Sequence, residues 1–392
     1  MAINTLSASS RVLHERNLLA LSYMNPSPRY GADGSIDYAN FFSRSCVAQG
    51  SYHRLRRGGV DVAVLGFGLN DPDRYPGREG VARIVQDLSA FHHAVREHSS
   101  LAGIARSAAD VRKLRRAGKM AFVLALTGVY LDGALEMLDG YAELGVRMAH
   151  PPFDTRAGRS ILAWKGTRGL TAFDRRVLQR MEQLGMAIDL SHASDRMVGE
   201  TLKMTSGPVL VSHGMCRALS PTKRNLTDNQ IRAIAGTGGV IGVHFAGQLI
   251  DPEYGRRLDA SGFREELARW VEGLKRKYPD PADFARKRYN VQRWERSRAY
   301  ALYESVAPPD IGRVVDHLDR IVDMAGIDHV CIGSDYDLGN MPKALNRADK
   351  LPALTKALRK RGYSHSDVRK INGANFMRVF SEVTTASLDL RP

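Results

Sequence analysis

The sequence has few cysteines: Cys46, Cys216 and Cys331 are the only three among its 392 residues. They lie far apart and match neither a zinc-ribbon nor a CxxC spacing, which excludes a disulfide scaffold and a cysteine-based metal centre. Such cysteine usage is typical of a reducing compartment, so we expect a cytoplasmic protein. We interpret Cys216 as a small buried thiol rather than a nucleophile.

Long apolar runs are also missing. No stretch approaches the roughly 20 apolar residues that a membrane helix requires. The N-terminal residues lack an apolar run long enough for the core of a signal peptide. We therefore expect a protein that neither enters a membrane nor is exported.

Acidic residues are outnumbered by basic ones, 42 to 57, which gives a formal net charge of +15. The basic residues are spread along the whole chain, and no RNP motif, zinc finger or basic-aromatic tract occurs. This pattern favours the basic surface of a soluble enzyme with a small-molecule substrate over a nucleic-acid-binding protein.

Short apolar runs, by contrast, recur throughout the chain, and runs without polar alternation are typical of strands buried on both faces in a parallel sheet. Helical patterns separate them. Alternation of this kind predicts a (β/α)₈ barrel of the TIM type, with an open doubly wound sheet as the alternative. The eight runs are 17–24, 60–67, 120–126, 145–150, 186–192, 207–213, 238–245 and 329–335.

We expect a single domain over residues 1–392. Residues 251–310 form a charged, helical insertion after the seventh strand, and we interpret it as a lid over the barrel mouth or as a surface insertion without a special role. The last helix, in 336–392, should pack against the outside of the barrel. Four helices are predicted between strands, at 132–145, 171–185, 227–239 and 311–326.

Histidines and one aspartate stand where predicted strands end: His150, His192, His213, His244 and Asp335. The carboxyl ends of barrel strands meet at one mouth, so these side chains should share a pocket. A single strand-end histidine is more often structural, but their coincidence favours a site. Imidazole and carboxylate are usual ligands of catalytic zinc, which takes three protein ligands and leaves one position open.

Several motifs resemble the membrane (renal) dipeptidase family, peptidase family M19. They are "GLTAFDRRVLQRMEQLGMAIDLSHAS", "PVLVSHGMCRALSPTKRNLTDNQIRAIAGTGGVIGV", "HLDRIVDMAGIDHVCIGSDYD" and "LRKRGYSHSDVRKINGANFMRVF". The likeness runs from about Gly59 to Phe380 and is strongest after Gly169. It implies an amidohydrolase-type (β/α)₈ barrel, hydrolysis of dipeptides with two zinc ions, and a tendency to dimerise.

The resemblance assigns roles to particular residues. It implies that His192 and His213 are zinc ligands and that Arg224 binds the carboxylate of the substrate. It further implies that Asp335 serves the attacking water and the proton transfer. We add His150 and His244 as further catalytic candidates at neighbouring strand ends.

The first-strand metal ligands of the family are replaced in this chain. The family has histidine and aspartate after its first strand, where this chain has Met24 and Pro26. A second register would place Ser35 and Asp37 there, but no apolar strand precedes them, so we prefer the first.

Two further positions depart from the family. The bridging glutamate after the third strand corresponds to Thr127, and the fourth-strand substrate histidine falls near Phe153, a short step after His150. Two close zinc ions need a shared carboxylate to screen their charges, so the sequence predicts one zinc ion or none.

Three functions follow. The first is a dipeptidase-like hydrolase of a small carboxylate-bearing peptide or amino-acid derivative. The second is a metal-free enzyme of a specialised biosynthetic pathway that catalyses cyclisation, elimination or amide hydrolysis. The third is a non-catalytic ligand-binding protein, against which the retained buried carboxylate argues.

Overall fold

All eight apolar runs form strands. The computed structural model describes residues 17–26, 28–30, 35–46, 48–68, 77–153, 163–279, 306–337 and 340–386. The barrel strands are β1 (Ala20–Met24), β4 (Val62–Phe67), β6 (Met120–Thr127), β7 (Val146–His150), β8 (Ala187–Ile188), β9 (Leu210–Gly214), β10 (Val240–His244) and β11 (Val330–Ser334).

The strands form a nearly closed barrel. Neighbours pair in parallel in the order β8-β7-β6-β4-β1-β11-β10-β9. The two ends of this order meet at a parallel bridge between Asp189 and Leu210, next to a 2.7 Å backbone hydrogen bond from Leu190 to Leu210. The TIM-type barrel is therefore confirmed over the open sheet. Outside the barrel order, β5 (Ala102–Ile104) pairs with β6, and β2 (Arg29–Tyr30) pairs with β3 (Ile36–Asp37).

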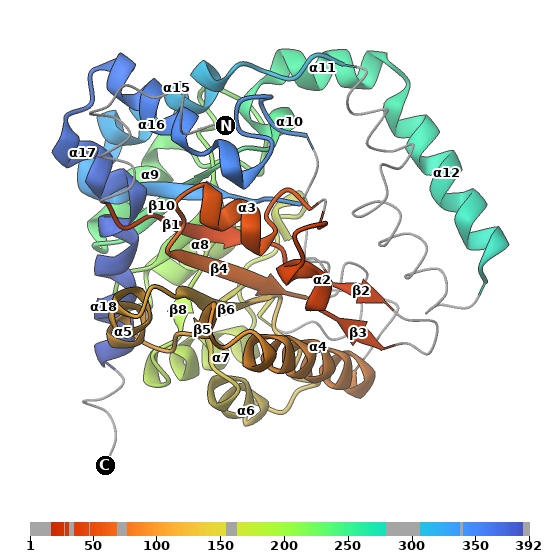
Figure 1. The fold of residues 1–392 in the computed structure, drawn as a ribbon. Coiled ribbons are helices and arrows are strands. Elements are labelled where there is room, and N and C mark those ends of the chain that lie inside the picture. The colour runs from red at the N-terminus through yellow and green to blue at the C-terminus, as the bar shows by residue number, and fades with distance from the viewer. Residues whose placement is uncertain are drawn as a thin grey trace.

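Helices surround the barrel (Figure 1). Two of the predicted ones begin at capping boxes, with Thr171 before α7 and Thr227 before α9. The helix predicted over 132–145 starts only at Met137, because Asp132 and Gly133 adopt left-handed backbone conformations. The α-helices are α2 (Ala39–Phe42), α3 (Tyr52–Arg57), α4 (Arg78–Glu97), α5 (Ala108–Arg116), α6 (Met137–Glu143), α7 (Ala172–Gln183), α8 (Asp195–Leu202), α9 (Asp228–Gly236), α10 (Gly247–Ile250), α11 (Pro252–Ala260), α12 (Phe263–Lys277), α15 (Ile311–Ala325), α16 (Pro352–Arg361), α17 (His365–Arg369) and α18 (Asn375–Ala386).

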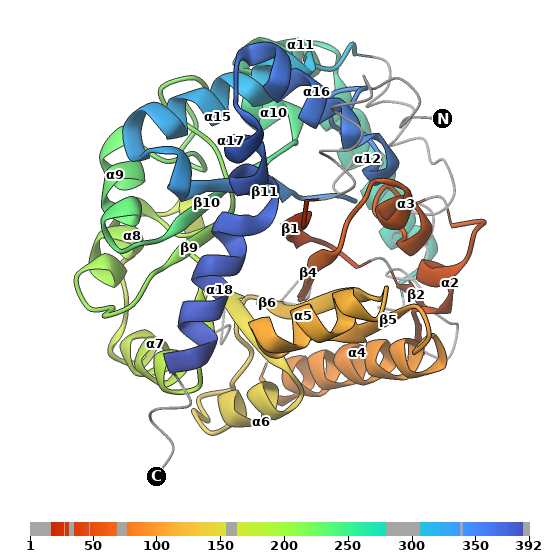
Figure 2. The same ribbon diagram turned by 60° about the vertical axis from the view of Figure 1, so that its left-hand side comes forward.

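The prediction that the last helix packs against the outside of the barrel was wrong. Helix α18 lies across the end of the barrel where the strands begin (Figure 2). Its Phe376, Val379 and Phe380 are buried in one cluster with residues of the barrel interior, such as Val64 and Val123. An apolar interior open to water would be costly, so this amphipathic helix closes that end.

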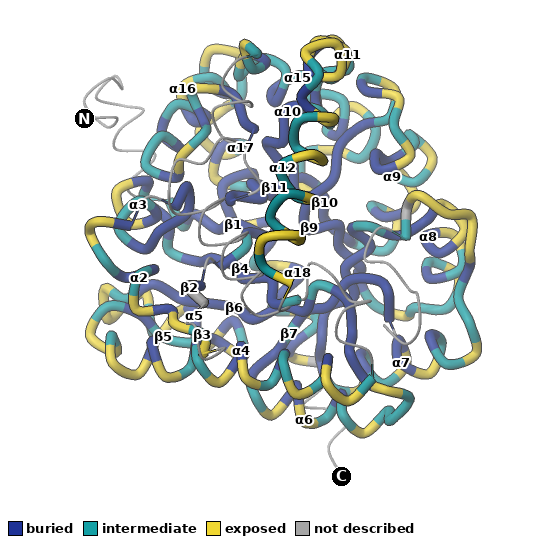
Figure 3. Tube along the Cα trace, turned by 90° about the vertical axis from the view of Figure 1, so that its right-hand side faces the viewer, coloured by how far each residue is buried: buried dark blue, intermediate teal, exposed yellow. Residues whose placement is uncertain are grey.

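The insertion after the seventh strand contains the helices α11 and α12, whereas its described residues 306–310 form no helix. Helix α12 lies across the opposite end of the barrel, where the strands finish, and its surface is mostly intermediate or exposed (Figure 3). Residues 280–305 lie outside the described residues, so its role as a lid stays a prediction. No helix in the described part of the chain is long and apolar enough to span a membrane.

Candidate active site

The strand-end histidines and Asp335 lie at one end of the barrel. His150 and His244 are the last residues of β7 and β10, His213 lies in β9, and Asp335 directly follows β11. His192 and Asp335 have φ angles of 65° and 61°, in the left-handed region that residues with a Cβ rarely adopt. Such backbone strain concentrates at functional sites, which marks this end of the barrel as the candidate site.

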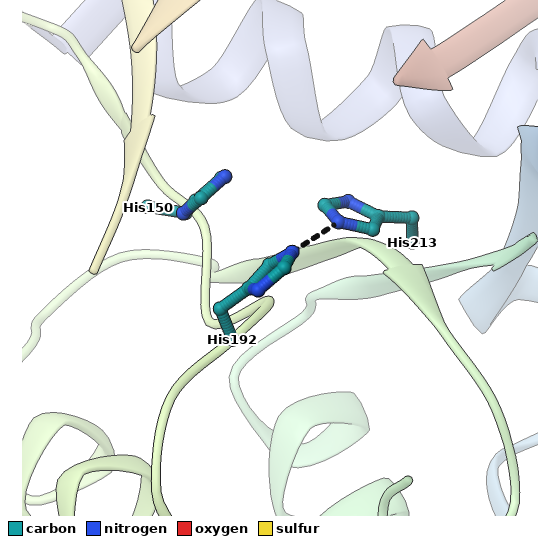
Figure 4. A group of neighbouring side chains, drawn as sticks. All are labelled: His150, His192 and His213. Carbon is teal, nitrogen blue, oxygen red and sulfur yellow. Dashed lines mark hydrogen bonds between the residues drawn. The ribbon is translucent and has the colours of Figure 1, made fainter. Parts of the chain in front are cut away.

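Three imidazoles form a compact group (Figure 4). The ligand nitrogens of His150, His192 and His213 all lie within 4.8 Å of one another. The Nε2 atoms of His192 and His213 are 2.9 Å apart, and the rings of His150 and His192 stack with centroids 4.7 Å apart. Nitrogen lone pairs this close could share one metal ion.

The hydrogen bonds of two rings set their tautomers. Nδ1 of His150 donates to the Pro151 carbonyl at 2.9 Å, while its buried Nε2 has no hydrogen-bond partner among the described residues. Nδ1 of His213 lies 2.8 Å from the Ser212 hydroxyl. Burial lowers the pKa of His150 and, with the Arg224 guanidinium nearby, lowers that of His213 well below its usual value. Both rings are therefore kept neutral, the form that binds metals.

Next to this group lies the buried carboxylate of Asp189, which the sequence analysis did not identify as part of the site. The Ser212 hydroxyl donates to Asp189, and Asp189 also accepts backbone hydrogen bonds of 2.9 Å from Ser191 and Ser212. The hydrogen-bonded series Asp189–Ser212–His213 therefore orients the imidazole through its Nδ1 atom. The only sequence signal was the acidic residue inside "DLSH", in a run that is otherwise apolar.

Arg224 and Asp335 lie beside the histidine group. Arg224 is buried and its Nη2 donates to the carbonyl of His213 at 2.8 Å. Burial lowers the pKa of Arg224, and the opposite charges of Asp335 and Asp189 counteract that effect. Asp335 accepts from the Asn25 side chain at 3.3 Å. The Arg224 guanidinium, which has further N–H groups besides Nη2, therefore lies near the Asp335 carboxylate at the barrel mouth.

His244 lies next to the histidine group, with its ring centroid 6.5 Å from that of His213. Its Nδ1 accepts from the backbone N–H of Ala246 at 3.1 Å, and burial together with Arg224 lowers its pKa well below the usual value. The ring is therefore neutral and carries its proton on Nε2, a fully buried atom without a hydrogen-bond partner among the described residues. An unsatisfied buried donor of this kind is costly unless a ligand pairs with it.

At the first strand, the interior position belongs to Tyr23 and not to Met24. The Tyr23 ring stacks on His213 with centroids 4.2 Å apart, and its hydroxyl is 2.5 Å from that of Thr127. Met24 packs in the outer cluster between strands and helices. The physical reason is an irregular register in β1, where Leu21 faces Ala63 and Met24 faces Leu65, so one extra residue alters the alternation.

Asp37, Phe153 and Cys216 are not part of the histidine group. Asp37 is exposed in the β2–β3 pair, away from the barrel strands, and caps the backbone of Ala39 at 2.7 Å, which argues against the second register. Phe153 is buried in the outer cluster, whereas His150 lies in the site. Cys216 is buried, and burial raises the pKa of its thiol to about 12, as expected for an unreactive cysteine.

The comparisons with known proteins agree with this architecture. A dipeptidase, ataJ, from Aspergillus terreus is 27% identical over 370 residues, which cover 86% of this chain and 77% of that protein. A dipeptidase, verJ, from Clonostachys rogersoniana is 23% identical over 359 residues, covering 88% and 78%. The crystal structure of the probable dipeptidase PvdM from Pseudomonas aeruginosa superposes with a TM-score of 0.75 at 24% identity, covering 98% of this chain and 99% of PvdM.

A metallo peptidase of Rhodobacter sphaeroides, liganded with a phosphinate mimic of the dipeptide L-Ala-D-Ala, gives a TM-score of 0.71 at 18% identity, covering 94% of this chain and 99% of that one. The model of the membrane dipeptidase family matches residues 12–391. The chain therefore belongs to the membrane dipeptidase family, peptidase family M19, a family of hydrolases.

Proposed function

We propose that this protein is a dipeptidase-like hydrolase of a small peptide or amino-acid derivative with a free carboxylate, and that its site holds at most one metal ion. The observation that carries the proposal is the group of three histidines at the barrel mouth. The orphaned Nε2 of His150 fits a ligand that accepts its lone pair. We infer that His150 joins His192 and His213 as ligands of zinc, in place of a separate catalytic role.

The described residues favour one ion over a bridged pair. The histidine group is the only cluster of three or more metal-ligating side chains found among them. Thr127 occupies the position where the resemblance implies a bridging glutamate, and its hydroxyl contacts the Tyr23 phenol. A threonine cannot screen two close cations as a carboxylate does.

Each remaining polar group has a role in this proposal. A bound zinc ion supplies Lewis acidity and makes water a nucleophile near neutral pH. Asp335 accepts the proton of the attacking water and passes it to the leaving amine. The buried guanidinium of Arg224 binds the substrate carboxylate. The Nε2–H of His244 donates a hydrogen bond to the bound substrate.

The test begins with protein purified without chelator. We expect about one zinc per chain by elemental analysis, hydrolysis of L-Ala-D-Ala or another member of a dipeptide set, and loss of metal and activity in His192→Ala. Arg224→Met should raise KM with little change in metal content.

Two outcomes would contradict the proposal. Full activity of metal-free protein and of His192→Ala would favour the metal-free enzyme. The second outcome is a zinc-loaded protein that binds dipeptides but does not hydrolyse them, and whose binding is the same in Asp335→Asn. It would favour the non-catalytic protein.

A further inference from the structure

Asp335, the base in the proposed function, follows β11 in a strained turn. Ser334 and Asp335 have φ angles of 62° and 61°, both in the left-handed region that residues with a Cβ rarely adopt. The carbonyl of Tyr23 in β1 accepts from the Ser334 hydroxyl at 2.8 Å and from the backbone N–H of Asp335 at 3.1 Å. The neighbouring strand therefore holds the backbone of Asp335 in this strained conformation.

Asn25 extends the contact between the two strands beyond their ends. Its backbone N–H donates to the Tyr336 carbonyl at 3.3 Å, and its side-chain Nδ2 donates to Oδ1 of Asp335, also at 3.3 Å. Because an ionised carboxylate only accepts hydrogen bonds, the amide must present its NH₂ group to Asp335. Pro26 follows Asn25, and the residue before a proline is restricted to extended conformations, which limits the directions open to the Asn25 side chain.

A general base needs a defined orientation. A carboxylate turns about its Cβ–Cγ bond and is effective only when an oxygen lies within hydrogen-bonding reach of the proton that it accepts. A hydrogen bond to Oδ1 of Asp335 restricts this rotation and favours the ionised form, which is the form that accepts a proton. Neither neighbour of Asn25 can supply such a bond, because Met24 packs in the outer cluster and the Pro26 side chain has no donor.

We propose that Asn25 is a positioning residue whose side-chain amide orients the carboxylate of Asp335 for proton transfer. The inference rests on the hydrolase function proposed above and on the role of Asp335 in it. The proton passes from the attacking water to Asp335 and then to the leaving amine, and Asn25 exchanges none. Leucine has the branched shape of asparagine but no donor, so Asn25→Leu tests the amide itself.

The experiment compares zinc-loaded wild type with Asn25→Leu, Asp335→Asn, the double variant and the control Asn40→Leu. Asn40 of α2 is half-buried like Asn25, but its amide donates to Sγ of Cys46 at 3.5 Å. Asn25→Ala, which adds no apolar bulk, repeats the test in case leucine prevents folding.

Three quantities are measured for each protein. Elemental analysis gives the zinc content, and steady-state assays with L-Ala-D-Ala, or with the dipeptide that the wild type hydrolyses fastest, give kcat and KM. Single-turnover assays with enzyme in excess give the residual rates of Asp335→Asn and of the double variant.

For Asn25→Leu and Asn25→Ala we expect unchanged zinc content and KM, with kcat lower by roughly 10- to 100-fold, as for loss of a hydrogen bond to a charged group. In the Asp335→Asn background the same Asn25→Leu change should alter the rate by less than about two-fold, because the base that the amide orients is gone. Asn40→Leu should keep the kcat and KM of the wild type.

Several results would overturn the role of Asn25 without contradicting the hydrolase function. They are a wild-type kcat in Asn25→Leu and Asn25→Ala, an equal fold-loss of rate in both backgrounds, loss of zinc from either Asn25 variant, and full activity of Asp335→Asn. If the wild type hydrolyses no dipeptide of the set, the hydrolase function itself is wrong, and the role of Asn25 with it.

Discussion

Ser212 places its hydroxyl between the carboxylate of Asp189 and Nδ1 of His213. The hydroxyl donates to Asp189 and lies 2.8 Å from Nδ1, so the ring nitrogen donates to Ser212 and keeps Nε2 unprotonated. Asp189 is fully buried and fixed by two backbone N–H groups. In the metal site that we propose, groups that orient an imidazole ligand in this way contribute to metal affinity without touching the ion.

Replacing Asp189 should therefore weaken metal binding. We expect Asp189→Asn to lower zinc affinity by about 10- to 100-fold, because an amide can donate to Ser212 and disturb the tautomer of His213. Zinc titration against a competing chelator measures the effect.

The control for Asp189→Asn is Ser194→Ala, which removes a buried hydrogen-bonding group outside the Asp189–Ser212–His213 series. Ser194 caps helix α8 by accepting from Met197 at 3.2 Å, and its side chain is not part of the histidine group. The control should lose about 1 kcal/mol of unfolding free energy and keep its zinc affinity. Equal zinc affinities of Asp189→Asn and wild type would show that the buried carboxylate does not support His213.

Gly66→Ala should destabilise the fold by displacing the Tyr23 ring. The added methyl group would overlap the Tyr23 phenol, and the Tyr23 ring also stacks on His213, so its displacement would disturb that contact. We expect a loss of about 1–3 kcal/mol in unfolding free energy, measured by urea denaturation.

In a Tyr23→Ala background the same Gly66→Ala change should cost much less, since the overlap is gone. The control Gly199→Ala lies on α8 with open space around the new Cβ and should stabilise by about 0.5–1 kcal/mol. An equal loss of unfolding free energy on Gly66→Ala in both backgrounds would show that the Tyr23 ring does not pack against Gly66.

His317 should make stability depend on pH. It is fully buried, accepts at Nδ1 from the backbone of Cys216 at 3.1 Å and donates from Nε2 to the Ile250 carbonyl at 3.0 Å. Burial lowers its pKa to about 4. The unfolded chain, with a pKa near 6.5, binds the proton more readily, so stability is full above pH 6.5 and falls as the pH drops from 6.5 to about 4.

The contribution of this residue is at most about 3 kcal/mol over that range. We expect His317→Gln to flatten the fall, with its amide still able to donate to Ile250. Parallel pH curves of unfolding free energy for wild type and variant would contradict the assignment.

Helix α18 should contribute to stability through its buried face. Phe380 is 1% exposed and packs with the barrel interior, so Phe380→Ala should cost about 3–5 kcal/mol in unfolding free energy. Glu382 of the same helix is the control, and Glu382→Ala should change stability by less than about 0.5 kcal/mol. A small effect of Phe380→Ala would mean that the barrel end is closed without this side chain.

Much of the fold could be predicted from local patterns. Runs such as 120–126 are apolar without alternation because their strands are buried on both faces. Thr171 and Thr227 mark the starts of helices because their side chains cap the backbone nearby. The strand-end positions of His192 and His213 predicted a shared mouth, since parallel strands of a barrel finish at one end.

Other features depend on contacts that no local pattern records. Tyr23 faces the site, and not Met24, because one extra residue in β1 changes its alternation against β4. Which face of the last helix meets the barrel, and at which end, depends on where the apolar interior is left open. The sequence alone thus determined the strands and the histidines that end them. Only the tertiary structure decided which side chains meet, because Asp189, Ser212 and Tyr23 reach the histidines through pairings between strands distant in sequence.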